Sequence, residues 1–165
     1  MKQYELQVGD DEVVVRLLSK YWVANGEILH VAFTLREKET YISVNRLSIA
    51  SFNTDITTFL SNHTDFYSDK EKREYLRAAL NVADIRNVRI AVDNMLLNTE
   101  VEVEPRNQYQ KSHAGIFTRV SGKNLKVGDL LFDSTLKKGI SADVILLEIR
   151  SRLLDIARLE TTETY

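Results

Sequence analysis

A chain of 165 residues is the size of one ordinary domain, and a composition of 44% hydrophobic and 28% charged residues is typical of globular rather than disordered proteins. The formal net charge is −2, from 22 basic and 24 acidic side chains, so no overall positive field attracts nucleic acid and we expect no nucleic-acid partner. The absence of cysteine excludes disulfides, iron–sulfur clusters, thiolate zinc sites and a cysteine nucleophile.

The chain shows no targeting or linker signal. No apolar run approaches the roughly 20 residues that cross a bilayer, and the first residues lead directly into charged sequence. The single proline and six glycines argue against a flexible linker. We therefore expect a cytoplasmic protein with no membrane partner, formed by one domain over residues 1–160 and a frayed tail over residues 161–165.

The first fifty residues have the pattern of an antiparallel meander. Residues 6–18 are rich in valine and leucine, which favours one or two strands turned at residues 9–11. Asn25-Gly26 is a dipeptide typical of tight hairpin turns. Residues 28–35 and 41–45 are then expected to form two strands that pair across a charged turn.

Two helices are expected next. Ser51 precedes apolar residues at helical spacing, and Ser68 to Glu71 has the form of a capping box ahead of a second helical period that ends near Val82. The apolar residues are Phe52, Ile56, Phe59 and Leu60 in the first helix, and Tyr75, Leu76, Ala79 and Leu80 in the second.

More strands follow, at residues 89–92, 100–104, 114–120 and 125–132. Residues 100–104 alternate glutamate with valine, so we expect Val101 and Val103 to be buried. Glu100, Glu102 and Glu104 should then face solvent or the basic segment that follows. A row of carboxylates can also bind a hard cation, but a solvated strand face is the simpler interpretation.

A long helix is expected from Ser141 to about Glu160. Its apolar residues are Leu146, Ile149, Leu153 and Ile156 at heptad spacing, widened by Val144, Leu147 and Leu154. This wide stripe predicts either a centrally buried helix or one that meets a partner, most simply as a homodimer through the C-terminal helix. The fold class is therefore α+β: an antiparallel β-sheet packed by two or three helices, with a long C-terminal helix.

No motif of established catalytic chemistry is present. The span from Gly115 to Asn124 has six residues between its glycines where a phosphate-binding Walker loop has four. Ser112 and His113 adjoin, but without the turn that exposes a serine nucleophile. The three histidines are far apart in the chain, so we expect no metal site and no cofactor.

Residues 105–128 form a basic segment with five lysines and arginines and no acidic residue, interleaved with Tyr109 and Phe117. Such a segment can hold a phosphate, a nucleotide or single-stranded nucleic acid. Alternatively it pairs with the acidic strand at residues 100–104, whose charge then cancels much of its field.

Three stretches together resemble a loose group of small, uncharacterised bacterial proteins. They are Arg16 with Trp22 and Gly26 ahead of Ala32-Phe33, the run Tyr41-Ile42-Ser43-Val44-Asn45-Arg46, and His113-Ala114-Gly115-Ile116. Ala83 to Arg86 resembles the segment that lies between the last two. The resemblance implies a shape and a bacterial origin, and no particular chemistry.

If the polar positions of these stretches converge, they form a small cleft. They are Arg16, Ser43, Asn45, Arg46 and His113, which together suit an anionic small molecule because guanidinium groups bind phosphate or carboxylate bidentately. We expect Arg46 to emerge at the end of its strand and nearby positive charge to keep His113 neutral. The alternative is structural: Arg46 pairs with an acidic residue and Asn45 satisfies a turn.

The leading expectation is a non-enzymatic binding or regulatory module of the bacterial cytosol that recognises an anionic ligand, because no constellation meets the geometry that catalysis requires. The alternative is a small enzyme acting on a phosphorylated or nucleotide-like substrate at Arg16, Arg46 and His113. One form of it resembles ADP-ribosyltransferases, with Arg16, Ser43 and Glu102 in the order of their site.

Overall fold

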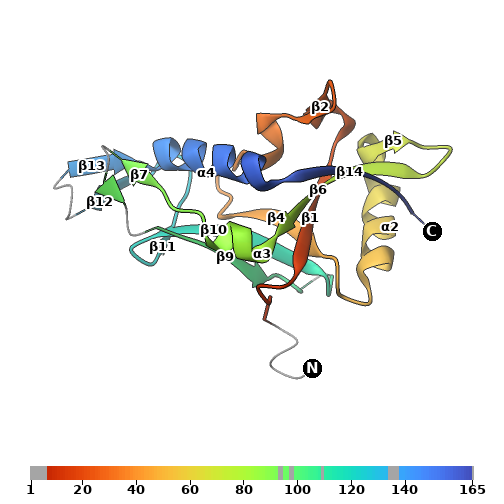
Figure 1. Cartoon of the computed structure of the whole chain (residues 1–165), viewed down its shortest axis with the longest axis horizontal. Helices are drawn as coiled ribbons and strands as arrows, with labels where there is room; N and C mark the ends of the chain where they lie inside the picture. Colours follow the sequence, from red (N-terminus) through yellow and green to blue (C-terminus); the bar gives the residue numbers. More distant parts are fainter. Residues whose placement is uncertain (1–6, 93–94, 97–98, 109, 134–137, 165) are drawn as a thin grey trace.

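A large curled antiparallel sheet organises the computed structural model, which describes residues 7–92, 95–96, 99–108, 110–133 and 138–164 (Figure 1). The sheet has eight strands, in the order β11-β10-β4-β1-β6-β14, with β9 paired to β10 and β5 to β6. Their bounds are β1 Val13–Leu18, β4 Tyr41–Arg46, β5 Tyr67–Asp69, β6 Glu74–Asn81, β9 Thr99–Pro105, β10 His113–Val120, β11 Lys123–Asn124 and β14 Arg158–Glu163.

Three α-helices pack with the sheet in the part of the chain that is described: α2 Phe52–Asn62, α3 Val82–Arg86 and α4 Ala142–Ile156. Short hairpins join β2 Val23–Ala24 to β3 Glu27–Ile28, β7 Ala91–Val92 to β8 Met95–Leu96, and β12 Leu130–Asp133 to β13 Lys138–Ser141. The 3-10 turns are η1 Lys20–Trp22, η2 His30–Phe33 and η3 Thr64–Phe66. The expected α+β class, with an antiparallel sheet, helices and a long helix near the C-terminus, is confirmed.

The two faces of the sheet carry two separate apolar cores. Val14 and Leu18 of β1 join the larger core, which also takes in the buried side of α4, whereas Val15 and Leu17 join a smaller core under α2. This alternation follows from the two-residue period of a strand. Figure 1 shows α4 running along the sheet and α2 standing at the end away from the β12–β13 hairpin.

The acidic strand buries its valines as expected, but Glu102 meets a helix instead of solvent or the basic segment. Val101 and Val103 are 2% and 1% exposed, while Glu102 pairs with Arg86 of α3 and Glu104 with Arg119 of the basic segment. The alternation of glutamate and valine therefore predicted both the burial and the face of this strand.

Three expected elements are wrong. Only Ile28 of residues 28–35 belongs to a strand, the short β3, and the rest form η2 and a loop. The expected meander does not form, and β4 pairs instead with β1 and β10. The expected helix at 68–82 is the hairpin of β5 and β6, turned at Arg73, whose φ is 53°. The expected strand at 125–132 is split by a turn at Gly128, whose φ is 87°, and only β12 remains of it.

The C-terminal helix ends at Ile156, before the expected Glu160. Of the four apolar residues expected at heptad spacing, Ile149 and Leu153 are buried, whereas Leu146 and Ile156 are only half-buried and Ile145 is buried instead. The expected frayed tail is also wrong, because Thr161, Thr162 and Glu163 belong to β14 and pair with β6. No helix within the described ranges is long and apolar enough to span a membrane.

Candidate functional site

A pocket of about 360 Å³ lies beside α2, lined by residues of β1, β4, the start of β10, α2 and η3. Its lining residues are Arg16, Leu17, Ser43, Asn45, Phe59, Phe66, Gln110 and His113. Four of the five residues expected to form a cleft are thus brought together, and Arg46 is not among them. Their binding of a ligand stays a prediction.

Strand register explains why the polar residues of β4 and β10 meet. Asn45 lies opposite His113, and Ser43 lies opposite Gly115. Directly opposed residues of an antiparallel pair share a face of the sheet. Asn45 is also opposite Val15 of β1, which packs in the smaller core with α2, so this face is the one that looks toward α2.

Arg16 enters the pocket at a break in the sheet. The pairing of β1 with β4 covers only Val14↔Arg46 and Val15↔Asn45, and the two strands separate beyond it. The Arg16 guanidinium fills this opening: Nε donates to the Ala32 carbonyl at 2.6 Å and Nη1 to the Ser43 carbonyl at 2.9 Å. The same group lies 5.3 Å from the centre of the Trp22 ring. Ala32, Ser43 and Trp22 therefore lie around one guanidinium.

Among the described residues, Arg16 forms no ion pair with a carboxylate, in contrast to Arg46, Arg77, Arg86 and Arg119. Burial lowers the pKa of Arg16 to about 10, an effect that Glu39 opposes and Arg36 reinforces by charge. Arg16 is therefore still a cation at neutral pH, half-buried and without an ion pair in the part of the chain that is described.

A buried hydrogen-bond network holds the other side of the pocket in position. The Asn45 Nδ2 group donates to Ser112 Oγ at 2.9 Å, and Ser112 Oγ donates to Asp55 Oδ2 at 2.7 Å. Asp55 also accepts from the Ser112 backbone N–H and from Ser51 Oγ, while Gln110 Nε2 donates to the Asp55 carbonyl. The network ties the first turns of α2 to β4 and β10, so the amide of Asn45 has a fixed orientation.

Two catalytic arrangements considered from the sequence are not assembled. Ser112 is fully buried, bonded to Asp55 and Asn45, and does not line the pocket, so it is not placed to act as a nucleophile. Glu102 is held by Arg86 and does not line the pocket with Arg16 and Ser43. Within the described ranges no group of three or more metal-binding side chains is placed to hold an ion.

Arg46 lies on the opposite face, so the expectation that it emerges at the end of its strand is wrong. It is 5% exposed and forms an ion pair with Glu12 at 2.8 Å, while its Nη2 also donates to the Gln7 carbonyl. The reason is strand parity: Arg46 follows Ile42 and Val44 at two-residue intervals and shares their buried face.

The aromatic wall of the pocket was not predicted. Phe59 had been expected to belong to the core face of its helix, and nothing in the charged stretch around Phe66 marks that residue as part of a site. In the structure both side chains are half-buried and line the pocket. The apolar i, i+3, i+4 spacing of α2 predicted its inward side but not which of those residues stays accessible.

The basic segment is neutralised in part, because one of its five basic side chains, Arg119, pairs with the acidic strand as the second of the two interpretations predicts. Arg119 pairs with Glu104 and lies 5.1 Å from the centre of the Phe117 ring. Arg106 lies 5.0 Å from the centre of the Tyr41 ring. Tyr109 lies outside the described residues, so its part in the segment is left open.

His113 is predicted to make folding pH-dependent. Burial lowers its pKa below 6.5 and the charge of Arg106 lowers it further, against a backbone hydrogen bond with Arg106 and the charge of Asp55, so the ring is neutral at pH 7. The depressed pKa means that the stability is full above about pH 6.5 and is lost as the pH falls through the pKa of the folded state. The slope cannot exceed about 1.4 kcal/mol per pH unit, because one proton is involved.

The measurement is denaturant unfolding between pH 7.5 and pH 5.5, with His113→Gln as the control. The variant should show a smaller loss of stability over this range than the wild type. Equal losses in the two proteins would contradict the prediction. Glu12, whose pKa is lowered from 4.5, contributes only at a more acidic pH.

The fold and the pocket together define an α+β domain with a ligand-sized cavity lined by Arg16, which forms no ion pair with a carboxylate among the described residues. Comparison with protein-family models, with curated proteins and with solved structures finds no significant match to this chain. The resemblance to a loose group of bacterial proteins therefore stays a prediction.

Proposed function

We propose that this chain is a binding module that holds a small anionic ligand in the pocket beside α2, with Arg16 as the group that neutralises the anion. The observation that supports the proposal is that Arg16 is a half-buried cation, lines the pocket and forms no ion pair with a carboxylate among the described residues. The module is proposed to act in the bacterial cytosol.

Electrostatics favours an anion at this place. A charge taken out of water without a partner destabilises the protein, and an anion that binds next to it removes that cost. A guanidinium has five N–H donors, and two of the nitrogen atoms of Arg16 already donate to carbonyl groups. The remaining donors, together with the neutral ring of His113 and the hydroxyl of Ser43, provide hydrogen bonds for a carboxylate or phosphate.

The test adds a carboxylate that competes with the ligand. Ser43 is exposed and lines the pocket, and its own carbonyl accepts from Arg16. In Ser43→Asp the new carboxylate should pair with Arg16 and abolish the thermal stabilisation by inorganic phosphate or acetate at constant ionic strength. A ligand present at 100 times its dissociation constant stabilises the wild type by about 2.7 kcal/mol.

Ser151→Asp is the matched control, because Ser151 is exposed on α4 and does not line the pocket. It should leave the stabilisation by anions intact. The proposal fails if the wild type shows no stabilisation by any anion, or if the Ser43 and Ser151 variants respond alike. Arg16→Met is a poorer test, since it also removes the bonds to Ala32 and Ser43.

The alternative function is an enzyme that acts on a phosphorylated substrate, and one observation favours it. A neutral His113, able to accept a proton, lines the same pocket as Arg16. Under this alternative His113→Gln keeps phosphate binding and loses turnover of phosphorylated substrates. Under the binding proposal no turnover occurs in either protein.

A homodimer through α4 is proposed as the second part of the function. Val144 and Leu147 of this helix are 50% and 51% exposed, and Leu130 and Phe132 of β12 are 76% and 74% exposed. Large exposed apolar side chains are typical of contact surfaces where they gather. Leu147→Glu should shift sedimentation toward the monomer, whereas a wild type that is monomeric at high concentration contradicts the dimer.

A further inference from the structure

The pocket has an aromatic wall whose rings hold one another in place. Phe59 and Phe66 line the pocket and meet edge to face, with ring centres 5.0 Å apart and planes at 85°. Phe66 meets Trp22 in the same way, at 5.4 Å and 81°, and the Trp22 ring lies 5.3 Å from the guanidinium of Arg16. Phe59 also stacks on His63 at 4.2 Å, with an angle of 11° between the planes.

This arrangement connects the wall directly to the charge of Arg16. Edge-to-face contacts fix the orientation of each ring, so the wall is rigid and presents flat apolar surface to the pocket. Phe59 and Phe66 are only half-buried, which leaves part of each ring accessible at the pocket. The pocket therefore combines a flat apolar surface with a cation, and the two are linked by Trp22.

A ligand that satisfies both features has an anionic group and a planar ring. The anionic group would lie on Arg16, and the ring would pack against Phe59 and Phe66, where it completes their burial. Offset or edge-to-face contact between aromatic rings adds to the stabilisation that burial alone provides. A saturated ring of equal size buries similar area but lacks this contact. The amide of Gln110, held by its bond to the Asp55 carbonyl, is placed to meet polar substituents on the ring.

We propose that the pocket selects ligands in which a planar aromatic or heteroaromatic ring carries one carboxylate or phosphate group. This inference rests on the proposed anion-binding function and adds the class of ligand to it. Two sources share this chemistry: aromatic carboxylic acids, and nucleotides in which a base and a phosphate are joined through a sugar.

Calorimetric titration with matched pairs of ligands tests the ring. Benzoate and cyclohexanecarboxylate have the same charge and similar size, and differ in planarity. We expect benzoate to bind about tenfold tighter to the wild type. In Phe59→Leu the affinity for benzoate should fall to nearly that for cyclohexanecarboxylate, while the binding of cyclohexanecarboxylate is kept. Adenosine monophosphate and ribose 5-phosphate form the second pair. If the ratio of affinities in this pair is larger than the ratio for benzoate and cyclohexanecarboxylate, nucleotides are identified as the source.

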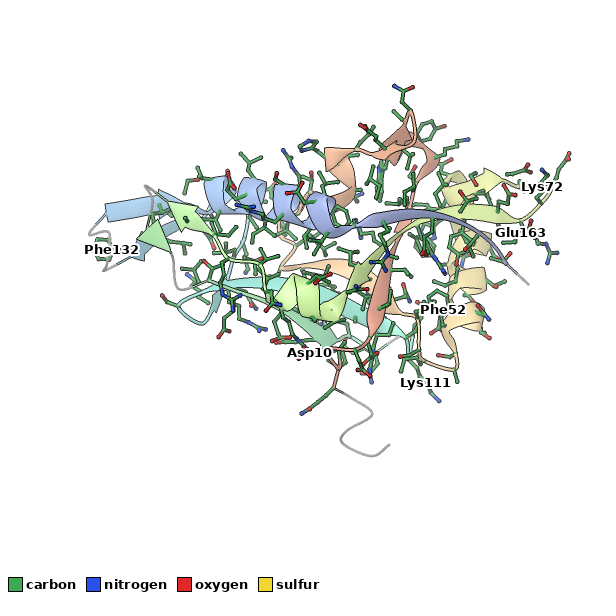
Figure 2. The ribbon with its side chains drawn as sticks, in the orientation of Figure 1. Asp10, Phe52, Lys72, Lys111, Phe132 and Glu163 are labelled. Carbon is green, nitrogen blue, oxygen red and sulfur yellow. The ribbon has the colours of Figure 1, made fainter. Side chains whose placement is uncertain are left out.

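Phe132→Leu is the control for the loss of a ring. Phe132 is 74% exposed on β12, and Figure 2 shows it at the end of the molecule away from Phe52 of α2. It should keep the full preference for benzoate. If Phe59→Leu lowers the melting temperature strongly, Phe66→Leu replaces it in the same titration.

The outcomes separate this inference from the function on which it rests. Equal affinity of the wild type for both members of each pair, with binding still abolished by Ser43→Asp, overturns the selection for aromatic rings and leaves anion binding intact. A wild type that binds no carboxylate and no phosphate overturns both. A preference for benzoate that persists in both the Phe59 and the Phe66 variant shows that the wall is not its cause and also overturns the inference.

Discussion

Replacement of Arg46 by methionine is expected to lower the free energy of unfolding by about 3 kcal/mol, because it leaves the carboxylate of Glu12 buried without its cation. Arg46 donates two hydrogen bonds to this carboxylate, from Nε at 2.9 Å and from Nη2 at 2.8 Å. The two side chains are only 6% and 13% exposed. Denaturant unfolding at pH 7 measures the change.

The pKa of Glu12 indicates how firmly the carboxylate is held. Burial alone would raise the pKa of Glu12, but hydrogen bonds from Arg46, the Gly9 N–H and Ser48 outweigh it and lower the pKa below 4.5. The stability from this group is therefore present above about pH 4.5 and is lost as the pH falls through the lowered pKa. The loss caused by Arg46→Met should accordingly shrink in acid, where Glu12 is protonated.

Two further variants test whether the Glu12–Arg46 ion pair causes the loss of stability. Glu12→Gln together with Arg46→Met should cost less than the sum of the single substitutions, because residues that share one ion pair are coupled. Arg36→Met, at an exposed arginine, should change stability by less than about 0.5 kcal/mol. A cost for Arg46→Met as small as that of the Arg36 control would show that the ion pair does not support the fold.

Gly115→Val is expected to cost about 2 kcal/mol through overpacking in the middle of the sheet. A Cβ atom at this position would lie 2.6 Å from Tyr41 Cδ2, 2.8 Å from Tyr41 Cγ and 3.0 Å from Phe117 Cε2. The Tyr41 ring is not free to move aside, because it packs at 5.1 Å on Phe117 and at 5.0 Å under the guanidinium of Arg106. Thermal or denaturant unfolding measures the cost.

The double variant Tyr41→Ala, Gly115→Val identifies the cause. Removing the Tyr41 ring removes the collision, so the added cost of valine should largely disappear in this background. If valine costs the same with and without the Tyr41 ring, the effect comes from the backbone of β10 instead. Because Gly115 lies opposite Ser43, the single variant should also weaken the anion binding proposed for the pocket.

The expected helix at 68–82 shows the limit of periodicity. In β6 the residues alternate between the two cores, with Ala78 and Leu80 in the larger core and Tyr75 and Ala79 in the smaller one. A strand buried on both faces has apolar residues in nearly every position, so a helical spacing can be found within it by chance. Its place between β1 and β14 involves partners far away in the sequence, which no local pattern encodes.

The candidate site was predicted in part for a physical reason. Ser43 and Asn45 are two residues apart on one strand and must share a face, and His113 begins the strand that pairs with theirs. The next residue along the strand, Arg46, points to the other face, which it shares with Ile42 and Val44, and it is therefore not part of the site. The error was to treat the end of a strand as exposed when an acidic partner, Glu12, lies against it from another part of the chain.

By itself the sequence determined the elements whose pattern is local: the α+β class, the helix with Phe52, Ile56 and Leu60 on one side, and the alternating strand with Val101 and Val103 buried. Only the tertiary structure decided that Arg16 lines a pocket and forms no ion pair within the described part of the chain. That role depends on where β1 and β4 separate, on the carbonyls of Ala32 and Ser43 that face the opening, and on rings from α2 and η3. Periodicity reports which side of an element is apolar, whereas a site forms where elements distant in sequence diverge, and that depends on packing across the whole domain.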